Sequence, residues 1–203
     1  MREQHQETIK LAILEDNENM LVGLRAQFDR PGFEVCVASD DREAFIMEVE
    51  AQEPDVVIVD LRIWECFDAG LEAIEAVRVA SPETECIVYT KYDKLEHFDR
   101  ALRLGVKGFV SKEHDVRPDI SLVEIVTMVS RGMSYYDKAI FDRYLMATEE
   151  IEKDDLAALP ARERPPELSN RALQVLELAA QDLQQQDIAY PLYINLNTVK
   201  THT

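Results

Sequence analysis

The sequence lacks the long apolar runs that a membrane-spanning segment requires. A run such as VVIV at residues 56–59 is far shorter than the roughly 20 residues of a transmembrane helix. The first ten residues, MREQHQETIK, are polar and contain no apolar core of a secretory signal. We therefore expect a cytoplasmic protein that does not associate with a membrane.

Cysteine is also scarce. The three cysteines, Cys36, Cys66 and Cys86, form no CxxC pair and have no spacing typical of a metal site. This pattern disfavours a disulfide scaffold and a zinc site. We expect reduced and mostly buried thiols, as in a cytosolic protein.

Positive charge is in short supply. The 203 residues include 22 Lys and Arg against 40 Asp and Glu, which gives a formal net charge of -18. Because contacts with phosphates need Lys and Arg, this balance disfavours a general nucleic-acid binder. It leaves room for a small DNA-reading patch in one domain.

Apolar strand-like runs alternate with amphipathic helical segments along the first two thirds of the chain. This alternation predicts a parallel α/β sheet that is covered by helices on both faces, with its site beyond the carboxyl ends of the strands. The expected strands are 9–14, 33–38, 55–61, 85–90 and 106–111. The first expected helix ends near Phe28, and the second begins after a cap at Asp40 or Asp41. The further expected helices span about 70–80, 94–104, 119–131 and 133–146.

Polar side chains follow or end four of these strands. Glu15 and Asp16 follow the first strand, Asp60 lies at the end of the third, Thr90 ends the fourth and Lys112 follows the fifth. Carboxylates brought together at one edge of a sheet repel one another, so they need a hard divalent cation with oxygen ligands, most simply Mg²⁺. Taken singly, such an Asp is more often a helix cap and such a Lys is more often exposed; the combination points to a phosphoryl site.

Four segments around these positions resemble the receiver domain of bacterial response regulators: LAILEDN (11–17), VVIVDLR (56–62), IVYTKY (87–92) and GVKGFVSK (105–112). The resemblance covers residues 8–131. It implies a CheY-like, doubly wound, five-stranded parallel sheet of order 2-1-3-4-5. It also implies phosphoryl transfer to Asp60 from a sensor histidine kinase or a small phosphodonor.

The same resemblance implies roles for further residues. Glu15, Asp16 and Asp60 would hold Mg²⁺ together with the main-chain carbonyl of Arg62. Thr90 and Lys112 would stabilise the phosphoryl group, and Thr90 and Phe109 would move on activation.

Three positions depart from the family pattern. Trp64 replaces the usual Pro four residues after the phosphorylated Asp, and Gly70 comes about two residues late, so that the 61–70 loop is longer and bulkier. Lys91 replaces the usual small residue after the Thr. We expect Lys91 to alter the kinetics of phosphorylation or dephosphorylation.

Residues 168–203 resemble the first three helices of a LuxR/NarL-type helix-turn-helix domain, a small all-α segment. The string TVKTH would open the recognition helix, so that Asn197, Thr198, Lys200 and Thr201 would face DNA. The match is partial: the chain ends where the recognition helix should continue, and the family's dimerising fourth helix is absent. Residues 132–167 are expected to form a linker helix followed by a charged, proline-rich linker.

The function implied is that of a two-component response regulator, a phosphoacceptor and not an enzyme, that dimerises on activation and controls transcription by binding DNA. The alternative is a signalling or pseudo-receiver module that acts by protein–protein contact, with a truncated or vestigial output domain that does not bind DNA. The slightly acidic 166–203 segment, with two basic and four acidic residues, keeps this alternative open. An aspartyl-phosphate phosphatase is disfavoured because Arg62 occupies the place of its second Asp.

Overall fold

The computed structural model describes residues 8–158 except 65, 67 and 114–119, and describes side chains only as far as Thr148. The chain divides after Asp137 into two compact units. The first unit carries the sheet and the polar strand ends.

Six parallel strands form one sheet in the order β2-β1-β3-β4-β5-β6. The first five strands appear in the expected order, which confirms the predicted fold class, and a short sixth strand extends the sheet. The strands are β1 (Ile9–Leu14), β2 (Phe33–Ser39), β3 (Val56–Val59), β4 (Glu85–Thr90), β5 (Gly108–Ser111) and β6 (Tyr135–Tyr136).

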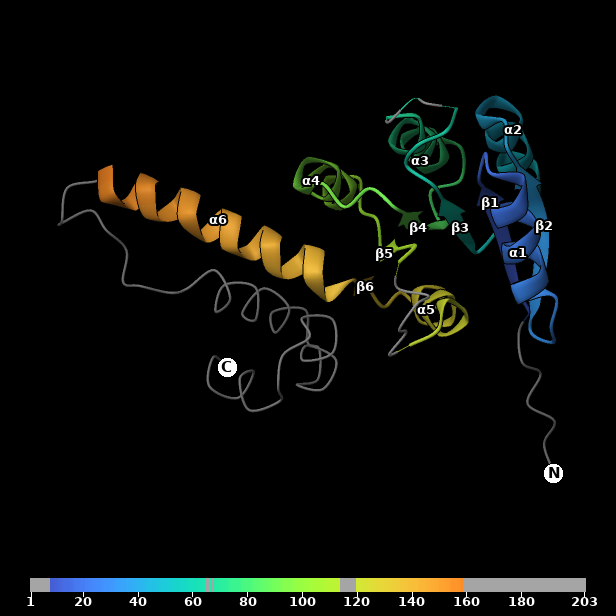
Figure 1. The fold of residues 1–203 in the computed structure, drawn as a ribbon. Coiled ribbons are helices and arrows are strands. Elements are labelled where there is room, and N and C mark those ends of the chain that lie inside the picture. Colours follow the sequence, from blue (N-terminus) through green and yellow to red (C-terminus); the bar gives the residue numbers. More distant parts are fainter. Residues whose placement is uncertain (1–7, 65, 67, 114–119, 159–203) are drawn as a thin grey trace. The chain divides into compact units, whose positions relative to one another are not determined.

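Helices cover both faces of the sheet, as Figure 1 shows for α3 and α4 on one side and α5 on the other. On the α5 side, Leu24 and Phe28 of α1 join side chains of α5 and the alternate strand residues Leu11 and Ile13 in one buried core. The helices of this unit are α1 (Glu18–Phe28), α2 (Arg42–Gln52), α3 (Ala69–Ala80), α4 (Leu95–Arg103) and α5 (Leu122–Val129).

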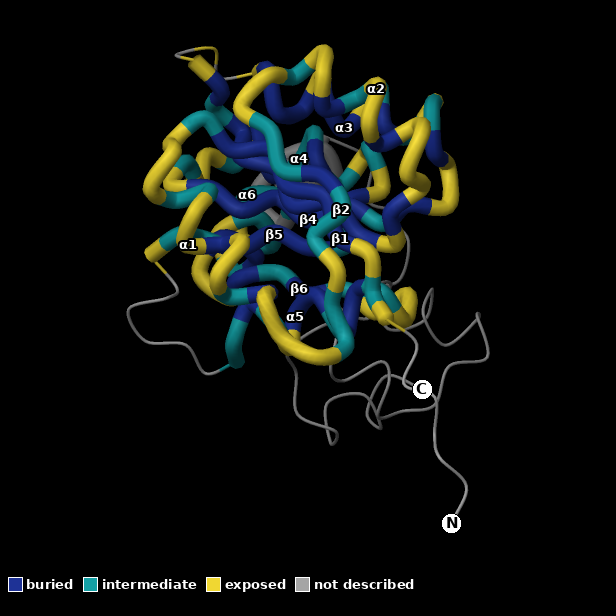
Figure 2. The backbone as a smooth tube through the Cα atoms, turned by 90° about the vertical axis from the view of Figure 1, so that its right-hand side faces the viewer, coloured by how far each residue is buried: buried dark blue, intermediate teal, exposed yellow. Residues whose placement is uncertain are grey.

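The central strands β1, β3 and β4 are buried along most of their length, and the helices expose their outer faces (Figure 2). All four residues of β3, for example, are buried. A strand covered on both faces needs apolar residues at every position, and this explains the continuous run VVIV. Because the buried middle of the sheet takes apolar residues, the buried charged residues lie where the strands end.

Polar side chains cap the helices that begin near these strand ends. Asn17 accepts a hydrogen bond from the Met20 amide at the start of α1, and Asp41 accepts one from the Ala44 amide at the start of α2. Ser121 forms a capping box with Glu124 at the start of α5. Of the two caps considered for α2, the structure selects Asp41.

The expected helix over 133–146 is wrong at its start. Tyr135 and Tyr136 instead form β6, which pairs with β5, and the backbone amide of Tyr135 donates to the Lys107 carbonyl. The aromatic pair favours an extended conformation because the buried Tyr135 ring packs in the core. In the second unit, α6 begins only at Lys138 and continues to Ala158, through part of the segment expected to be linker.

The expectation of mostly buried thiols is only partly met. Cys86 is buried, Cys36 is half-buried and Cys66 is exposed. Burial raises the pKa of Cys86 to about 12, so this thiol stays protonated. Among the described residues, no helix combines the length and the apolar character that crossing a membrane requires.

Gly70 lies where two backbone segments approach each other at the end of β3. Its amide donates to the Leu61 carbonyl at 3.0 Å, and a Cβ at this position would overlap the Asp60 carbonyl oxygen and lie 2.6 Å from the Leu61 Cα. Glycine is therefore required for α3 to start so close to Asp60. The late glycine of the 61–70 loop is at the position that the backbone needs.

We expect Gly70→Ala to lower the free energy of unfolding by about 1–3 kcal/mol, because the new methyl group forces the backbone beside Asp60 to move. Urea denaturation measures this change. Gly23→Ala is the matched control: the exposed site on α1 has no atom within 4 Å of the added Cβ. It should raise the free energy of unfolding by about 1 kcal/mol through helix propensity. Equal effects at the two sites would contradict the close approach at Gly70.

Candidate phosphoryl-acceptor site

Parallel pairing of the central strands brings the polar strand ends to one edge of the sheet. Glu15 and Asp16 directly follow β1, and Asp60 directly follows β3, its neighbour in the sheet. The Asp60 amide donates to the Leu14 carbonyl at 3.0 Å, so the two chain segments stay in register beyond the last paired residues. On the other side of β3, Thr90 ends β4 and Lys112 follows β5.

The carboxylates of Glu15, Asp16 and Asp60 form one cluster. One oxygen of each lies within 4.8 Å of the others. Glu15 is 2% exposed and Asp60 is 7% exposed, whereas Asp16 is half-buried. Three carboxylates that lie this close together and this far from solvent repel one another strongly unless positive charge compensates them.

Lys112 supplies part of that compensation. Its ammonium Nζ lies 2.6 Å from Glu15 Oε2 and 2.6 Å from Asp60 Oδ2, and its side chain is only 4% exposed. The backbone amide of Lys112 donates to the Thr90 carbonyl at 2.8 Å, which fixes the residue against the end of β4. The buried ammonium is thereby shared by two of the three acids.

Backbone amides provide a second kind of donor. The Asn17 amide lies 3.3 Å from Glu15 Oε1, and the Arg62 amide lies 3.5 Å from Asp60 Oδ1. The Trp64 amide donates to Asp16 Oδ2 at 2.8 Å, the shortest of the three. Every acid of the cluster therefore has a main-chain N–H beside it.

Burial raises the pKa of Glu15 above its ordinary value of 4.5, because desolvation disfavours the charged carboxylate. The hydrogen bond and the charge of Lys112 act in the opposite direction, and the charge of Asp60 adds to the rise. An added cation near Glu15 would favour its ionised form. The protonation of this acid is thus coupled to whatever positive charge the cluster holds.

Thr90 and Phe109, the two residues expected to move on activation, are fully covered. Thr90 is 0% exposed, and its hydroxyl oxygen accepts the Tyr92 amide at 3.1 Å. Phe109 on β5 is 1% exposed and packs edge-on against Phe98 of α4, with ring centroids 5.1 Å apart. The ring of Phe109 is therefore turned inward in this structure.

A hollow opens over the cluster. Arg62 and Tyr92 contribute to its wall, and the Arg62 guanidinium lies 5.3 Å from the centroid of the Tyr92 ring. Tyr92 had no role in the sequence-based prediction. Lys91, one of the departures from the family pattern, also lines the wall. The full lining is Glu15, Asp16, Asn17, Met20, Asp60, Arg62, Lys91, Tyr92 and Lys112.

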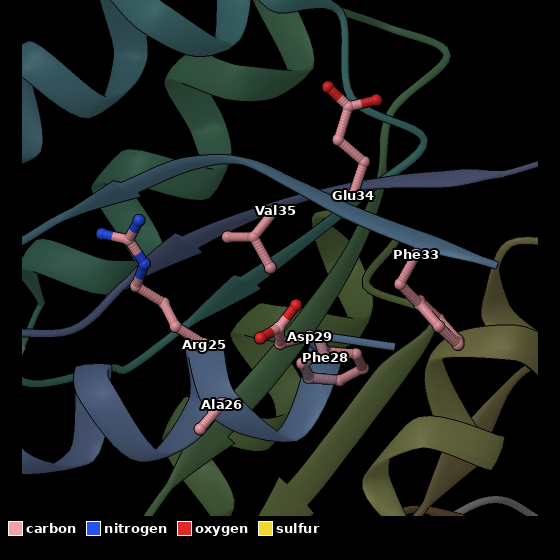
Figure 3. Close-up of a pocket in the computed structure, with 7 residues that line it drawn as sticks. All are labelled: Arg25, Ala26, Phe28, Asp29, Phe33, Glu34 and Val35. Atoms are coloured by element: carbon pink, nitrogen blue, oxygen red, sulfur yellow. The ribbon is translucent and has the colours of Figure 1, made fainter. Parts of the chain in front are cut away.

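A second hollow lies at the opposite end of the sheet, between the end of α1 and the start of β2 (Figure 3). Arg25 comes from α1, Asp29 caps the end of α1, and Glu34 comes from the edge strand β2. It contains none of the acids, the hydroxyl or the ammonium expected at a phosphoryl site. Its full lining is Arg25, Ala26, Phe28, Asp29, Phe33, Glu34 and Val35.

The donor set of the cluster suits a divalent cation. Three carboxylate oxygens within 4.8 Å match the preference of Mg²⁺ for oxygen ligands, and one ammonium leaves the cluster with excess negative charge. The Arg62 carbonyl stays a predicted ligand. The residues predicted to contact DNA, Asn197, Thr198, Lys200 and Thr201, lie outside the described residues.

Comparison with known families agrees with this geometry. The family described as "Response regulator receiver domain" matches residues 11–124, more than half of the chain. The family described as "Bacterial regulatory proteins, luxR family" matches residues 166–203. The chain belongs to the LuxR-type response regulators. It combines a receiver domain with a LuxR-type output module and controls transcription, as expected from the sequence.

Individual relatives of this response regulator are similar to it over most of their length. The oxygen regulatory protein NreC of Staphylococcus haemolyticus (strain JCSC1435) is 29% identical over 96% of this chain and 87% of its own. The transcriptional regulatory protein DegU of Brevibacillus brevis is 27% identical over 100% of this chain and 88% of its own. A LuxR-family response regulator from Aurantimonas sp. SI85-9A1 has the same fold, with a TM-score of 0.61 at 21% identity, over 71% of this chain and 99% of that structure.

We expect the contribution of Glu15 to the stability of the metal-free response regulator to decrease as the pH rises from about 4.5, because its raised pKa lets this group bind more protons in the native state than in the unfolded chain. Glu15→Gln removes this titration. The variant should be more stable than the wild type at about pH 7 and should lose that advantage toward about pH 4.

Urea unfolding in a chelator at several pH values measures this difference. Glu50→Gln, the same change at an exposed position of α2, is the control and should keep the wild-type dependence. A parallel pH dependence in Glu15→Gln and the wild type would contradict a role for Glu15 burial.

Proposed function

We propose that this response regulator accepts a phosphoryl group on Asp60 from a sensor histidine kinase or a small phosphodonor. The observation that carries the proposal is the contact of Lys112 Nζ with Asp60 Oδ2 at 2.6 Å, inside a cluster of three carboxylates. Aspartate is a nucleophile toward phosphorus when nearby positive charge offsets the charge of the incoming group. Lys112 is held ready to supply that charge.

Group transfer forms a bond between a carboxylate oxygen of Asp60 and phosphorus. The bond between phosphorus and the donor nitrogen or oxygen breaks, and its electron pair leaves with the donor. Glu15, Asp16, Asp60 and the Arg62 carbonyl would hold Mg²⁺, which neutralises charge on the phosphoryl oxygens when bound. The chain acts in this way as a phosphoacceptor and not as an enzyme with turnover.

Thr90 and Phe109 are proposed to report the modification. The Thr90 hydroxyl oxygen accepts an amide hydrogen bond, so its own hydrogen is available to a phosphoryl oxygen. A shift of this buried side chain changes the space beside β5, where Phe109 packs against α4. Packing between β5 and α4 would thus change when Asp60 is phosphorylated.

The output proposed is DNA binding by the LuxR-type module, with Asn197, Thr198, Lys200 and Thr201 toward the DNA and with a homodimer on activation. The luxR family match over residues 166–203 supports this output. The domain boundaries 8–131, 132–167 and 168–203 and the cytoplasmic location are part of the same proposal.

We expect wild-type protein incubated with Mg²⁺ and acetyl phosphate to gain the mass of one phosphoryl group, and Asp60→Asn to gain none, because the amide is not a nucleophile. Intact mass spectrometry measures the gain. Asp29→Asn makes the same chemical change at an exposed position after α1 and should behave as the wild type. Phosphorylation of Asp60→Asn to the wild-type extent would place the acceptor elsewhere.

We expect the phosphorylated full chain to bind mixed-sequence duplex DNA less tightly as salt rises. Lys200→Ala should flatten the slope of log affinity against log salt by about 1, because one phosphate contact is lost. Gel shifts over a range of salt concentrations measure the slope, and Lys107→Ala on the receiver unit is the control. A wild-type chain that shows no binding at low salt would favour the protein–protein signalling role instead.

A further inference from the structure

Trp64 connects the long 61–70 loop to the acidic cluster. It is the single tryptophan of the chain, and its φ of 47° lies in the left-handed region that a bulky residue seldom adopts. Its amide donates to Asp16 Oδ2 at 2.8 Å, across 48 positions of sequence. Within the described residues, Asp16 has no ion-pair partner, so this hydrogen bond is its main polar contact.

The other two acids are held differently. Lys112 contacts both Glu15 and Asp60, and their amide neighbours Asn17 and Arg62 lie only two residues away in sequence. The two Lys112 contacts join residues that directly follow β1, β3 and β5. The contact to Asp16 persists only while the 61–70 loop keeps its conformation.

The Trp64 side chain fixes that conformation. Its indole Nε1–H donates to the Asp40 carbonyl at 2.9 Å, beyond the end of β2. On either side of Trp64, Ile63 and Cys66 exchange two backbone hydrogen bonds, with N–O distances of 3.2 and 3.0 Å. The strained φ of Trp64 is thus maintained by this turn and by the indole hydrogen bond to Asp40, which we call the anchor.

We propose that Trp64 is a positioning residue of the cation site: its indole pins the loop to Asp40, so that its amide holds Asp16 in place for a divalent cation. This inference rests on the proposed function, because it assigns a task to Trp64 in the same cluster. Trp64 contacts no reacting atom and acts only through Asp16.

Loss of the anchor has a specific consequence. The turn would then leave the left-handed conformation for part of the time, and Asp16 would lose its amide donor and its fixed orientation. The pairing of Lys112 with Glu15 and Asp60 does not involve Trp64 and would remain. The affinity for the cation therefore falls while the fold of the receiver unit persists.

Trp64→Phe tests the anchor, because it keeps an aromatic ring, the backbone amide and the strain at φ and removes the pyrrole part of the indole with its N–H. Isothermal titration with Mg²⁺ should show affinity about 2- to 10-fold weaker than in the wild type, as loss of one hydrogen bond implies. Thermal unfolding in a chelator should be nearly unchanged. Val79→Ala, at an exposed apolar residue of α3, is the control and should bind as the wild type does.

The outcomes separate the two proposals. Wild-type affinity in Trp64→Phe would overturn the positioning role and leave the proposed function intact. A wild-type protein that takes up no Mg²⁺ would overturn the cation site and the positioning role together.

A spectroscopic measurement on the wild type tests the indole hydrogen bond without a substitution. With a single tryptophan, a ¹H–¹⁵N spectrum contains a single indole N–H signal. We expect this proton to exchange slowly with water despite a residue exposure of 65%, and to shift on addition of Mg²⁺. Free exchange of the indole proton with solvent, with no response to Mg²⁺, would overturn the proposal.

Discussion

Repulsion among three carboxylates is the constraint around which the receiver unit is organised. Glu15, Asp16 and Asp60 bring negative charge into a small and largely dry volume at the edge of the sheet. Such a cluster persists in a folded protein only when donors and cations surround it. The buried ammonium of Lys112 and three main-chain amides meet that need in part, and the remaining charge makes the cluster a receptor for further positive charge.

The fold supplies these donors because of its topology. Parallel pairing places the ends of β1, β3, β4 and β5 on one edge, so that short loops deliver acids, a hydroxyl and an ammonium to the same place. The central strand β3 is apolar and buried at every position, and it pairs on both sides with strands whose ends carry site residues. Gly70 then lets α3 begin directly against the backbone of Asp60. The position of Asp60 in the acidic cluster therefore depends on the close packing of Gly70 against its backbone.

Much of this arrangement was predictable from the pattern of residues. Alternating strands and helices indicated the doubly wound sheet, and the polar residues after each strand indicated the edge where Glu15, Asp16, Asp60 and Lys112 meet. The prediction was wrong at β6, where a helix was expected, because the extended conformation of Tyr135 depends on pairing with β5. It also missed Tyr92, whose ring lies under the guanidinium of Arg62.

The sequence by itself determined which side chains stand at the strand ends, because a strand that is buried on both faces, such as β3, is apolar throughout and its polar residues follow it. Only the tertiary structure decided how those side chains pair. Lys112 is shared by Glu15 and Asp60, while Asp16 takes its hydrogen bond from Trp64, 48 positions away. Such partners are set by the distances at which loops meet once the sheet has formed, and local sequence patterns do not contain those distances.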